Sequence, residues 1–231
     1  MYQKLIYLFL IIFFISACNK KEVEYNIPPG KEQSFKIYRE ALEAFESRDF
    51  FYASKKFYEA EAILPKIEFS AKASLMASYC LYIINFFPEA TSGLEIFIKK
   101  YPADKNIAYA YYLLAIVSYE QILDEKKDIK PLLDTRNQIE YFLKTFPNTE
   151  YALDLKFKLD LVDNQLAAKE MYIAKYYITT QKWIPAINRL KFIISDYSET
   201  IFIEEALHRL VEVYYTLGLT EEAQAPSSDA S

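Results

Sequence analysis

Few side chains in this sequence could perform covalent or metal chemistry. The 231 residues include one histidine, His208, two cysteines, Cys18 and Cys80, and three glycines. A His/Cys zinc site needs about four ligands, and a serine–histidine triad would have to rest on His208 alone. Cys80 lies in an apolar helical stretch and is expected to be a small buried side chain. We therefore expect no catalytic residue, metal or cofactor, and a hydrolase that depends on His208 is the weaker alternative.

Cys18 follows a short apolar leader. Lys4 is the only charge before it, and Leu5 to Ile15 is an unbroken apolar run of 11 residues. Such a run is too short to span a bilayer as a helix but fits the core of a signal peptide. Residues 15–18, ISAC, resemble the bacterial lipobox, which implies cleavage before Cys18 and its modification with palmitate. The alternative is an ordinary secretory leader followed by an incidental cysteine.

The mature chain would begin with a tether. Residues 1–17 are predicted to be the signal peptide and residues 18–33 a lipidated, extended linker, polar and interrupted by Pro28-Pro29-Gly30. By analogy with lipoprotein sorting, Asn19 in place of Asp implies delivery to the outer membrane.

A spacing that occurs four times organises the remaining chain. In residues 52–65, YASKKFYEAEAILP, three residues of one helical face stand at relative positions 0, 4 and 7, and a proline stands at position 12. The four sets are Ala53, Phe57, Ala60, Pro65; Ala90, Leu94, Phe97, Pro102; Thr135, Ile139, Phe142, Pro147; and Ala186, Leu190, Ile193, Ser198. This self-similarity predicts stacked helical hairpins.

The period of the pattern is 37 residues with two insertions. Positions 65, 102, 147 and 198 are separated by 37, 45 and 51 residues, and a further 37 from Ala186 reaches Ala223. The charged segment 124–131 is predicted to hold the insertion of 8 as a loop. Residues 150–181 contain neither Pro nor Gly, so the insertion of 14 is predicted to lie within one long helix. A small residue stands 12 positions before the first residue of each set, when the 8 inserted residues of the third unit are left out of the count. These residues are Ala41, Ser78, Ala115 and Ala174.

These offsets resemble the second helix of the tetratricopeptide repeat. The resemblance implies an all-α solenoid of about five hairpins over residues 34–224, with a long shared helix near 149–181, and residues 225–231 read as a disordered tail. Together with the lipobox, the chain is similar to the BamD family of outer-membrane lipoproteins. Residues 106–112, NIAYAYY, and 171–187, MYIAKYYITTQKWIPAI, carry the local similarity. Ser198, where the family has proline, and the short chain end depart from it.

The family resemblance implies a scaffold without enzymatic activity. Its expected partners are BamA and the other subunits of the β-barrel assembly machine, unfolded outer-membrane protein precursors, and the membrane through the lipid anchor, at the periplasmic face of the outer membrane. A net charge of −5 without a basic stripe argues against nucleic acid. The alternatives are a lipoprotein of a pilus-assembly or peptidoglycan-linked complex, and a soluble periplasmic chaperone.

Two sets of residues are the binding candidates. First helices of such repeats line a concave face, and eight of its twelve positions in the first three units are aromatic. The predicted precursor-binding groove comprises Phe35, Tyr38, Phe45, Lys72, Tyr79, Tyr82, Tyr109, Tyr112 and Tyr119. The predicted BamA-docking set comprises Tyr176, Tyr177, Lys182, Trp183 and Arg189, since Trp and Arg often anchor interfaces. The alternatives are that the rings pack between helices and that Trp183 fills the core at its hairpin turn.

Overall fold

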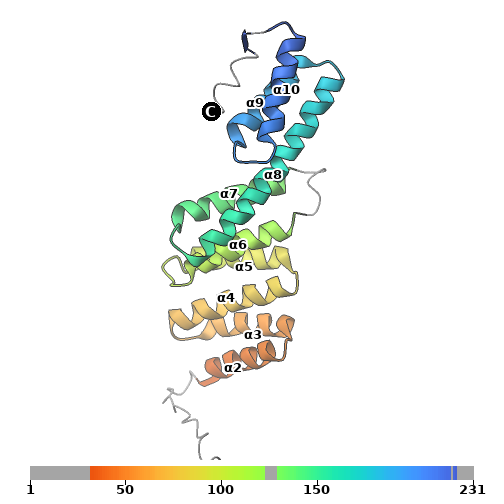
Figure 1. The fold of residues 1–231 in the computed structure, drawn as a ribbon. Helices are drawn as coiled ribbons and strands as arrows, with labels where there is room; N and C mark the ends of the chain where they lie inside the picture. Colours follow the sequence, from red (N-terminus) through yellow and green to blue (C-terminus); the bar gives the residue numbers. More distant parts are fainter. Residues whose placement is uncertain (1–31, 123–128, 220, 223–231) are drawn as a thin grey trace, which may run out of the picture.

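A computed structural model describes residues 32–122, 129–219 and 221–222 and shows α-helices and no strand within them (Figure 1). The helices are α2 (Glu32–Glu46), α3 (Phe50–Ile63), α4 (Ile67–Ile83), α5 (Phe87–Lys100), α6 (Ile107–Glu120), α7 (Lys130–Thr145), α8 (Glu150–Thr179), α9 (Trp183–Asp196) and α10 (Ile203–Thr216). The predicted signal peptide, Cys18, most of the tether, Ala223 and the tail lie outside the described residues. The first helix begins two residues before the predicted boundary at residue 34.

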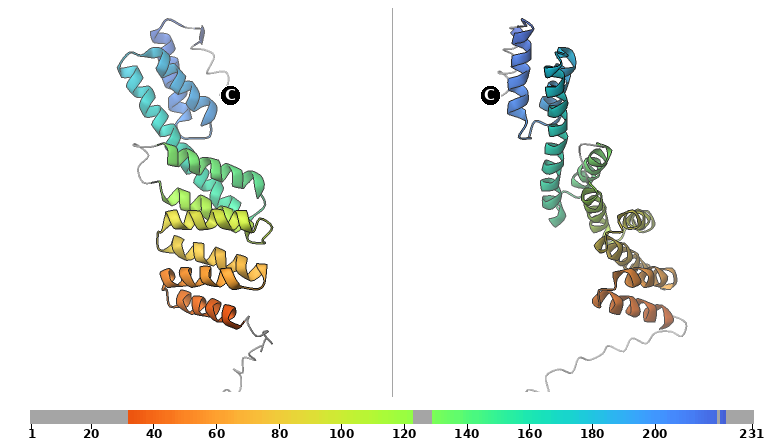
Figure 2. Two further views of the ribbon diagram at one scale, coloured as in Figure 1. Left: turned by 180° about the vertical axis from the view of Figure 1, so that it is seen from behind. Right: turned by 90° about the vertical axis from the view of Figure 1, so that its right-hand side faces the viewer.

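Successive helices pack as hairpins, and the hairpins stack. α2 packs on α3, α4 on α5, α6 on α7 and α8 on α9, while the second helix of each unit also contacts the first helix of the next. Figure 2 shows the stack from behind and from the side. The predicted all-α repeat architecture is confirmed.

The repeated sequence pattern forms the core of each hairpin. All twelve residues at relative positions 0, 4 and 7 have 0% exposure, and so have Ala41, Ser78, Ala115 and Ala174 on the first helices. A small residue on each helix lets the two backbones approach, and the large side chains fill the space beside them. The 37-residue pattern is therefore a packing rule rather than a surface feature.

The second helices all end at the same position of the pattern. The residue before position 12 is the C-cap in every unit, and its N–H donates to the carbonyl of position 7. The four pairs are Leu64 to Ala60, Tyr101 to Phe97, Phe146 to Phe142 and Tyr197 to Ile193, at 2.8 to 3.0 Å. A proline forces its preceding residue out of the helical region in three units. Ser198 leaves the end of the fourth unit unchanged, so the proline is not required for termination there.

The turns within the hairpins repeat a left-handed conformation. Arg48, Asn85 and Gln181 have φ of 65, 61 and 56°, and Gly218 has φ of 75°. In each case the next residue donates its N–H to a carbonyl five residues back, as at Lys182 to Tyr177 (2.8 Å) and Leu219 to Tyr214 (3.0 Å). Gly218 stands 37 residues after Gln181, so α10 is the first helix of a fifth unit in the predicted register.

The predicted long shared helix is confirmed as α8, which has 30 residues. Its N-terminal half packs through Leu155 on α6 and α7, and its C-terminal half packs through Leu166 and Met171 on α9 and α10. Figure 2, viewed from the side, shows α9 and α10 against only one half of α8. The loop insertion falls largely on residues 123–128, outside the described residues. α7 begins at Lys130, within the segment 124–131 that was predicted to be a loop, because Pro131 fits the first turn of a helix.

Candidate functional site

The residues with potential for covalent or metal chemistry do not assemble into a centre. His208 lies exposed on α10, with its Nδ1 3.6 Å from the carboxylate of Glu212 one turn away. Cys80 is buried, and burial raises the pKa of its thiol to about 12. Among the described residues, no three His, Cys, Asp or Glu side chains are grouped to hold a metal ion. None of the described helices combines the length and apolarity needed to cross a membrane.

Rings of the predicted groove approach one another along successive first helices. The ring centroids of Phe45 on α2 and Tyr79 on α4 are 6.3 Å apart, and Tyr79 is 6.3 Å from Tyr82 on the same helix. At the near end, Phe35 meets Phe69 edge-on at 5.5 Å, and Tyr38 meets Phe57 at 5.6 Å. Phe45 of unit one thus meets Tyr79 of unit two, whereas Phe35 and Tyr38 contact rings outside the predicted set, Phe69 on α4 and the buried Phe57 on α3.

A tyrosine cluster continues this line on α6. Tyr112 stacks on Tyr151 with centroids 4.7 Å apart, and Tyr109 is 6.1 Å from Tyr112. The Tyr112 hydroxyl donates to Asp154 at 3.0 Å. Tyr151 and Asp154 belong to α8 and were missed by sequence reasoning. The sequence could have indicated these two residues, because the first turns of a helix that begins at Glu150 lie against α6.

The electrostatics of the cluster keep its hydroxyls protonated. Burial raises the pKa of Tyr109 to about 12. Burial, reinforced by the hydrogen bond to Asp154, also raises the pKa of Tyr112. At neutral pH the hydroxyls are therefore neutral donors and acceptors. Tyr119 lies under the ammonium of Lys158, 5.2 Å from its ring centroid.

The exposure of the predicted groove residues divides them into two kinds. Lys72 is exposed and lines a cleft with Ile67, Phe69, Tyr101 and Lys105. The eight rings are half-buried. Each ring therefore uses one part to pack against neighbouring helices and leaves another part accessible. We refer to Phe45, Tyr79, Tyr82, Tyr109, Tyr112 and Tyr119 as the ring ladder.

The predicted docking residues gather where α8 turns into α9. Trp183, half-buried, and Lys182 line a shallow apolar groove with Ile184, Pro185, Leu217 and Leu219. Tyr177 and Arg189 line an adjoining groove with Pro185, Asn188 and Phe192. Tyr176 is exposed beside Tyr177, with centroids 5.8 Å apart.

Sequence reasoning missed the exposed apolar residues of this end. Ile184 is 72% exposed and lies near Leu219. The repeat register could have identified them, because the residues at the equivalent positions of the first two units, Phe51 and Phe86, are also large and apolar. The rings of Phe51 and Phe86 lie 5.9 Å apart.

Arg189 is tied into the fold. Its guanidinium nitrogen lies 2.8 Å from the carboxylate of Glu170, a buried residue of α8. A second polar junction holds the two halves of the solenoid together, since Arg136 of α7 pairs with Asp163 of α8 at 2.6 Å. The guanidinium of Arg136 also lies over the ring of Tyr197. Arg189 thus has a structural partner in addition to any external one.

Comparison with known proteins gives consistent relatives. A family model described as YfiO, outer membrane lipoprotein, matches residues 31–228. Outer membrane protein assembly factor BamD of Rickettsia prowazekii is 36% identical over 192 residues, covering 83% of this chain and 76% of that protein. The protein of the same name from Caulobacter vibrioides is 39% identical over 168 residues, covering 73% of this chain and 55% of that protein, or about half its length. The TPR2AB-domain:pHSP90 complex of yeast Sti1 aligns with a TM-score of 0.46 and 15% identity, covering 87% and 77% of the two chains.

Proposed function

Because the chain belongs to the YfiO family of outer membrane lipoproteins, we propose that it is a scaffold of outer-membrane protein assembly that binds BamA and unfolded β-barrel precursors. Its curated relatives are named assembly factors, and the function assigned to this chain includes no catalytic step. The proposed location is the periplasmic face of the outer membrane, with Cys18 as the lipid-modified residue.

The observation that carries precursor binding is the ring ladder. Phe45 of α2 approaches Tyr79 of α4 to 6.3 Å, and on the next first helix, α6, Tyr109 and Tyr112 lie 6.1 Å apart. Precursors of β-barrels carry apolar and aromatic side chains at alternate positions, and such side chains favour contact with partly exposed rings.

The proposed BamA-docking surface is the end of the α8–α9 hairpin. Trp183 and Ile184 offer apolar area next to the exposed Lys182. This combination of an aromatic anchor, an apolar groove and a rim charge is typical of protein interfaces. Tyr176 and Tyr177 extend the surface along α8.

The decisive experiment is affinity purification of the tagged chain from detergent-solubilised outer membrane. We expect BamA to copurify with the wild type, and Lys182→Glu combined with Tyr176→Ala to reduce its recovery severalfold. Lys191→Glu, at an exposed lysine within α9 rather than at its N-cap, serves as the matched control for the charge reversal. Copurification with pilus-assembly or peptidoglycan-bound proteins in place of BamA would contradict the proposal.

Two further measurements test the remaining parts. Palmitate labelling is expected for the wild type and not for Cys18→Ala, which separates an anchored scaffold from a soluble chaperone. Crosslinking of precursor peptides is expected to map to the first helices. Crosslinks confined to the second helices would refute the groove assignment.

A further inference from the structure

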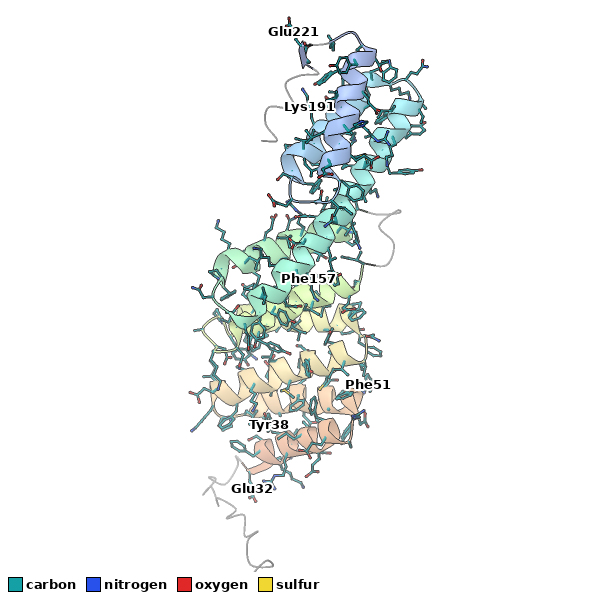
Figure 3. The ribbon with its side chains drawn as sticks, in the orientation of Figure 1. Glu32, Tyr38, Phe51, Phe157, Lys191 and Glu221 are labelled. Carbon is teal, nitrogen blue, oxygen red and sulfur yellow. The ribbon has the colours of Figure 1, made fainter. Side chains whose placement is uncertain are left out.

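Three apolar side chains on α8 stand open to solvent in one line. Leu153 is 79% exposed, Phe157 62% and Leu161 38%, and their spacing of four residues places them along one side of the helix. We call them the α8 stripe. Figure 3 labels Phe157 on the half of α8 that runs beside α6 and α7. The buried residues of the same turns, Ala152 and Leu155, face the core.

The stripe is uncovered because of the insertion that lengthens α8. In units one to three a second helix packs along the whole first helix, whereas α9 covers only the C-terminal half of α8, as Figure 2 shows from the side. The loop after α9 crosses at Asn164, whose side chain accepts the N–H of Ile201 at 3.1 Å. Leu161 and Phe157 lie on the uncovered turns immediately before Asn164.

The stripe adjoins the ring ladder. Asp154, next to Leu153, accepts the hydroxyl of Tyr112 at 3.0 Å. Lys158, next to Phe157, lies 5.2 Å from the ring centroid of Tyr119. The stripe therefore runs beside the side of α8 that contacts the ring ladder, one residue, or about 100°, further round the helix.

The spacing of the stripe fits an extended chain. Residues four apart on a helix are separated by about 6 Å along its axis. Alternate side chains of a β-strand that point to one face are separated by about 6.6 to 6.8 Å. An extended segment lying along α8 would present one apolar side chain to each of Leu153, Phe157 and Leu161 with little change of register. Strands of membrane β-barrels carry apolar side chains at such alternate positions.

A second copy of the chain is a poorer occupant. Each partner of a stable complex buries about 800 Å². Three side chains flanked by charged residues such as Lys156 and Asp160 supply far less apolar surface than this.

We propose that the α8 stripe is part of the precursor-binding surface, holding an extended segment that has apolar side chains at every second position. This proposal rests on the proposed function and extends its groove from the first three units onto α8.

The test compares two fluorescent peptides of about ten residues, the length of a transmembrane strand. One has Leu and Phe at every second position, and its isomer has the same composition with the apolar residues at helical spacing. Binding to the full chain in detergent is followed by fluorescence anisotropy. Leu153→Ser combined with Phe157→Ser is expected to weaken binding of the alternating peptide about tenfold, from the loss of exposed apolar contact area. Tyr172→Ser, which also removes an exposed apolar side chain from α8, should change it less than about twofold.

The outcomes separate this inference from the proposed function. Wild-type binding that is unchanged in the double variant, with unaltered thermal unfolding, would overturn the role of the stripe and leave the ring ladder in place. Tighter, stripe-dependent binding of the helically spaced isomer would overturn it in favour of a helical partner. If the wild type bound neither peptide, precursor binding itself would fail, whereas BamA copurification would be judged separately.

Discussion

The guanidinium of Arg189 on α9 lies 2.8 Å from the carboxylate of Glu170 on α8, and the Glu170 side chain is only 6% exposed. Removing the arginine would leave a carboxylate in a poorly solvated place without its counter-charge. We expect Arg189→Ala to lower the free energy of unfolding by about 2 to 3 kcal/mol in urea titrations. In a Glu170→Gln background the same change should cost less than half as much. Equal costs in both backgrounds would show that the ion pair is not the cause.

This ion pair affects how docking should be tested. Charge reversal at Arg189 would place two carboxylates together and perturb the α8–α9 hairpin, so lost BamA binding could reflect local unfolding. Lys182 is exposed and is the better position for charge reversal.

The left-handed turn at Gln181 predicts a stabilising substitution. Its φ of 56° is costly for a residue with a Cβ, and glycine adopts it freely, as Gly218 does at the equivalent position. Gln181→Gly should raise the free energy of unfolding by about 1 kcal/mol. Gln121→Gly is the matched control, because Gln121 ends α6 with φ of −86° and should gain nothing. A gain of similar size at both sites would contradict the explanation.

Replacing Gly93 by alanine should destabilise the protein, which is the opposite of the usual effect of this substitution within a helix. Alanine normally stabilises a helix interior by about 0.5 to 1 kcal/mol. A Cβ at Gly93 would lie 2.3 Å from the Tyr58 hydroxyl oxygen and 2.5 Å from Ser78 Oγ. Gly93→Ala is therefore expected to destabilise the protein by about 1 to 3 kcal/mol in thermal or urea unfolding.

A rescue variant checks the cause. Tyr58→Phe with Ser78→Ala removes both crowding oxygens, and Gly93→Ala in that background should be far less costly. A penalty that persisted unchanged would point to backbone displacement instead.

Cys80 is expected to be unreactive in the native state. It is 0% exposed, and burial raises its thiol pKa to about 12, so the thiolate fraction near pH 8 is about one in ten thousand. Iodoacetamide labelling followed by mass spectrometry should modify Cys80 only in denaturant. Rapid labelling of the folded protein would show that α4 opens locally.

Glu205 links α10 to α8 in a pH-dependent way. Its carboxylate lies 2.8 Å from Lys175 and 2.7 Å from Arg209, and the hydrogen bond from Lys175 lowers the pKa of Glu205. Because the folded pKa lies below the unfolded value of about 4.3, the pair stabilises the fold above that pH and loses its effect as pH falls through the folded pKa.

The measurement is the free energy of unfolding of Glu205→Gln against wild type. We expect a deficit of at most about 1 kcal/mol near pH 7, since the pair is partly exposed, and a deficit that shrinks as the pH falls below the unfolded pKa of about 4.3. A deficit that persisted in acid would indicate lost packing rather than lost charge.

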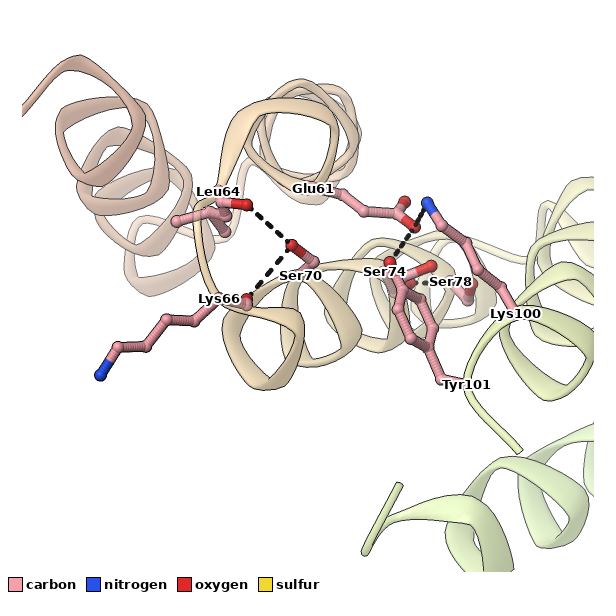
Figure 4. Close-up of polar contacts among 8 residues, drawn as sticks. All are labelled: Glu61, Leu64, Lys66, Ser70, Ser74, Ser78, Lys100 and Tyr101. Carbon is pink, nitrogen blue, oxygen red and sulfur yellow. Dashed lines mark hydrogen bonds and ion pairs between the residues drawn. The ribbon is translucent and has the colours of Figure 1, made fainter. Parts of the chain in front are cut away.

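Figure 4 illustrates a contact that the repeat pattern does not contain. The carboxylate of Glu61 on α3 accepts hydrogen bonds from Lys100 and from the Tyr101 hydroxyl, both at 2.9 Å. The serines Ser70 and Ser78 on α4 bond to backbone carbonyls nearby. The equivalents of Glu61 in the other units are Ile98, Leu143 and Ile194. This polar junction joins the first two hairpins only, and no periodic signal marks it.

Sequence alone determined the units of this protein. Positions such as Ala53 and Phe57 recur at fixed offsets because each hairpin buries the same face, so their spacing states which residues meet within a unit. The prolines at 65, 102 and 147 mark helix ends because they constrain the preceding residue. The length of α8 followed from residues 150–181 lacking any helix breaker.

Tertiary structure decided what the surfaces present. Periodicity could not distinguish the half-buried Tyr112, packed on Tyr151, from the open Phe157, because exposure depends on how far α9 extends along α8. Nor could it pair Arg189 with Glu170, since long charged side chains find partners through the crossing of helices rather than through sequence offset. Contacts within a hairpin are set by local spacing, whereas contacts between hairpins depend on the stacking of the whole array.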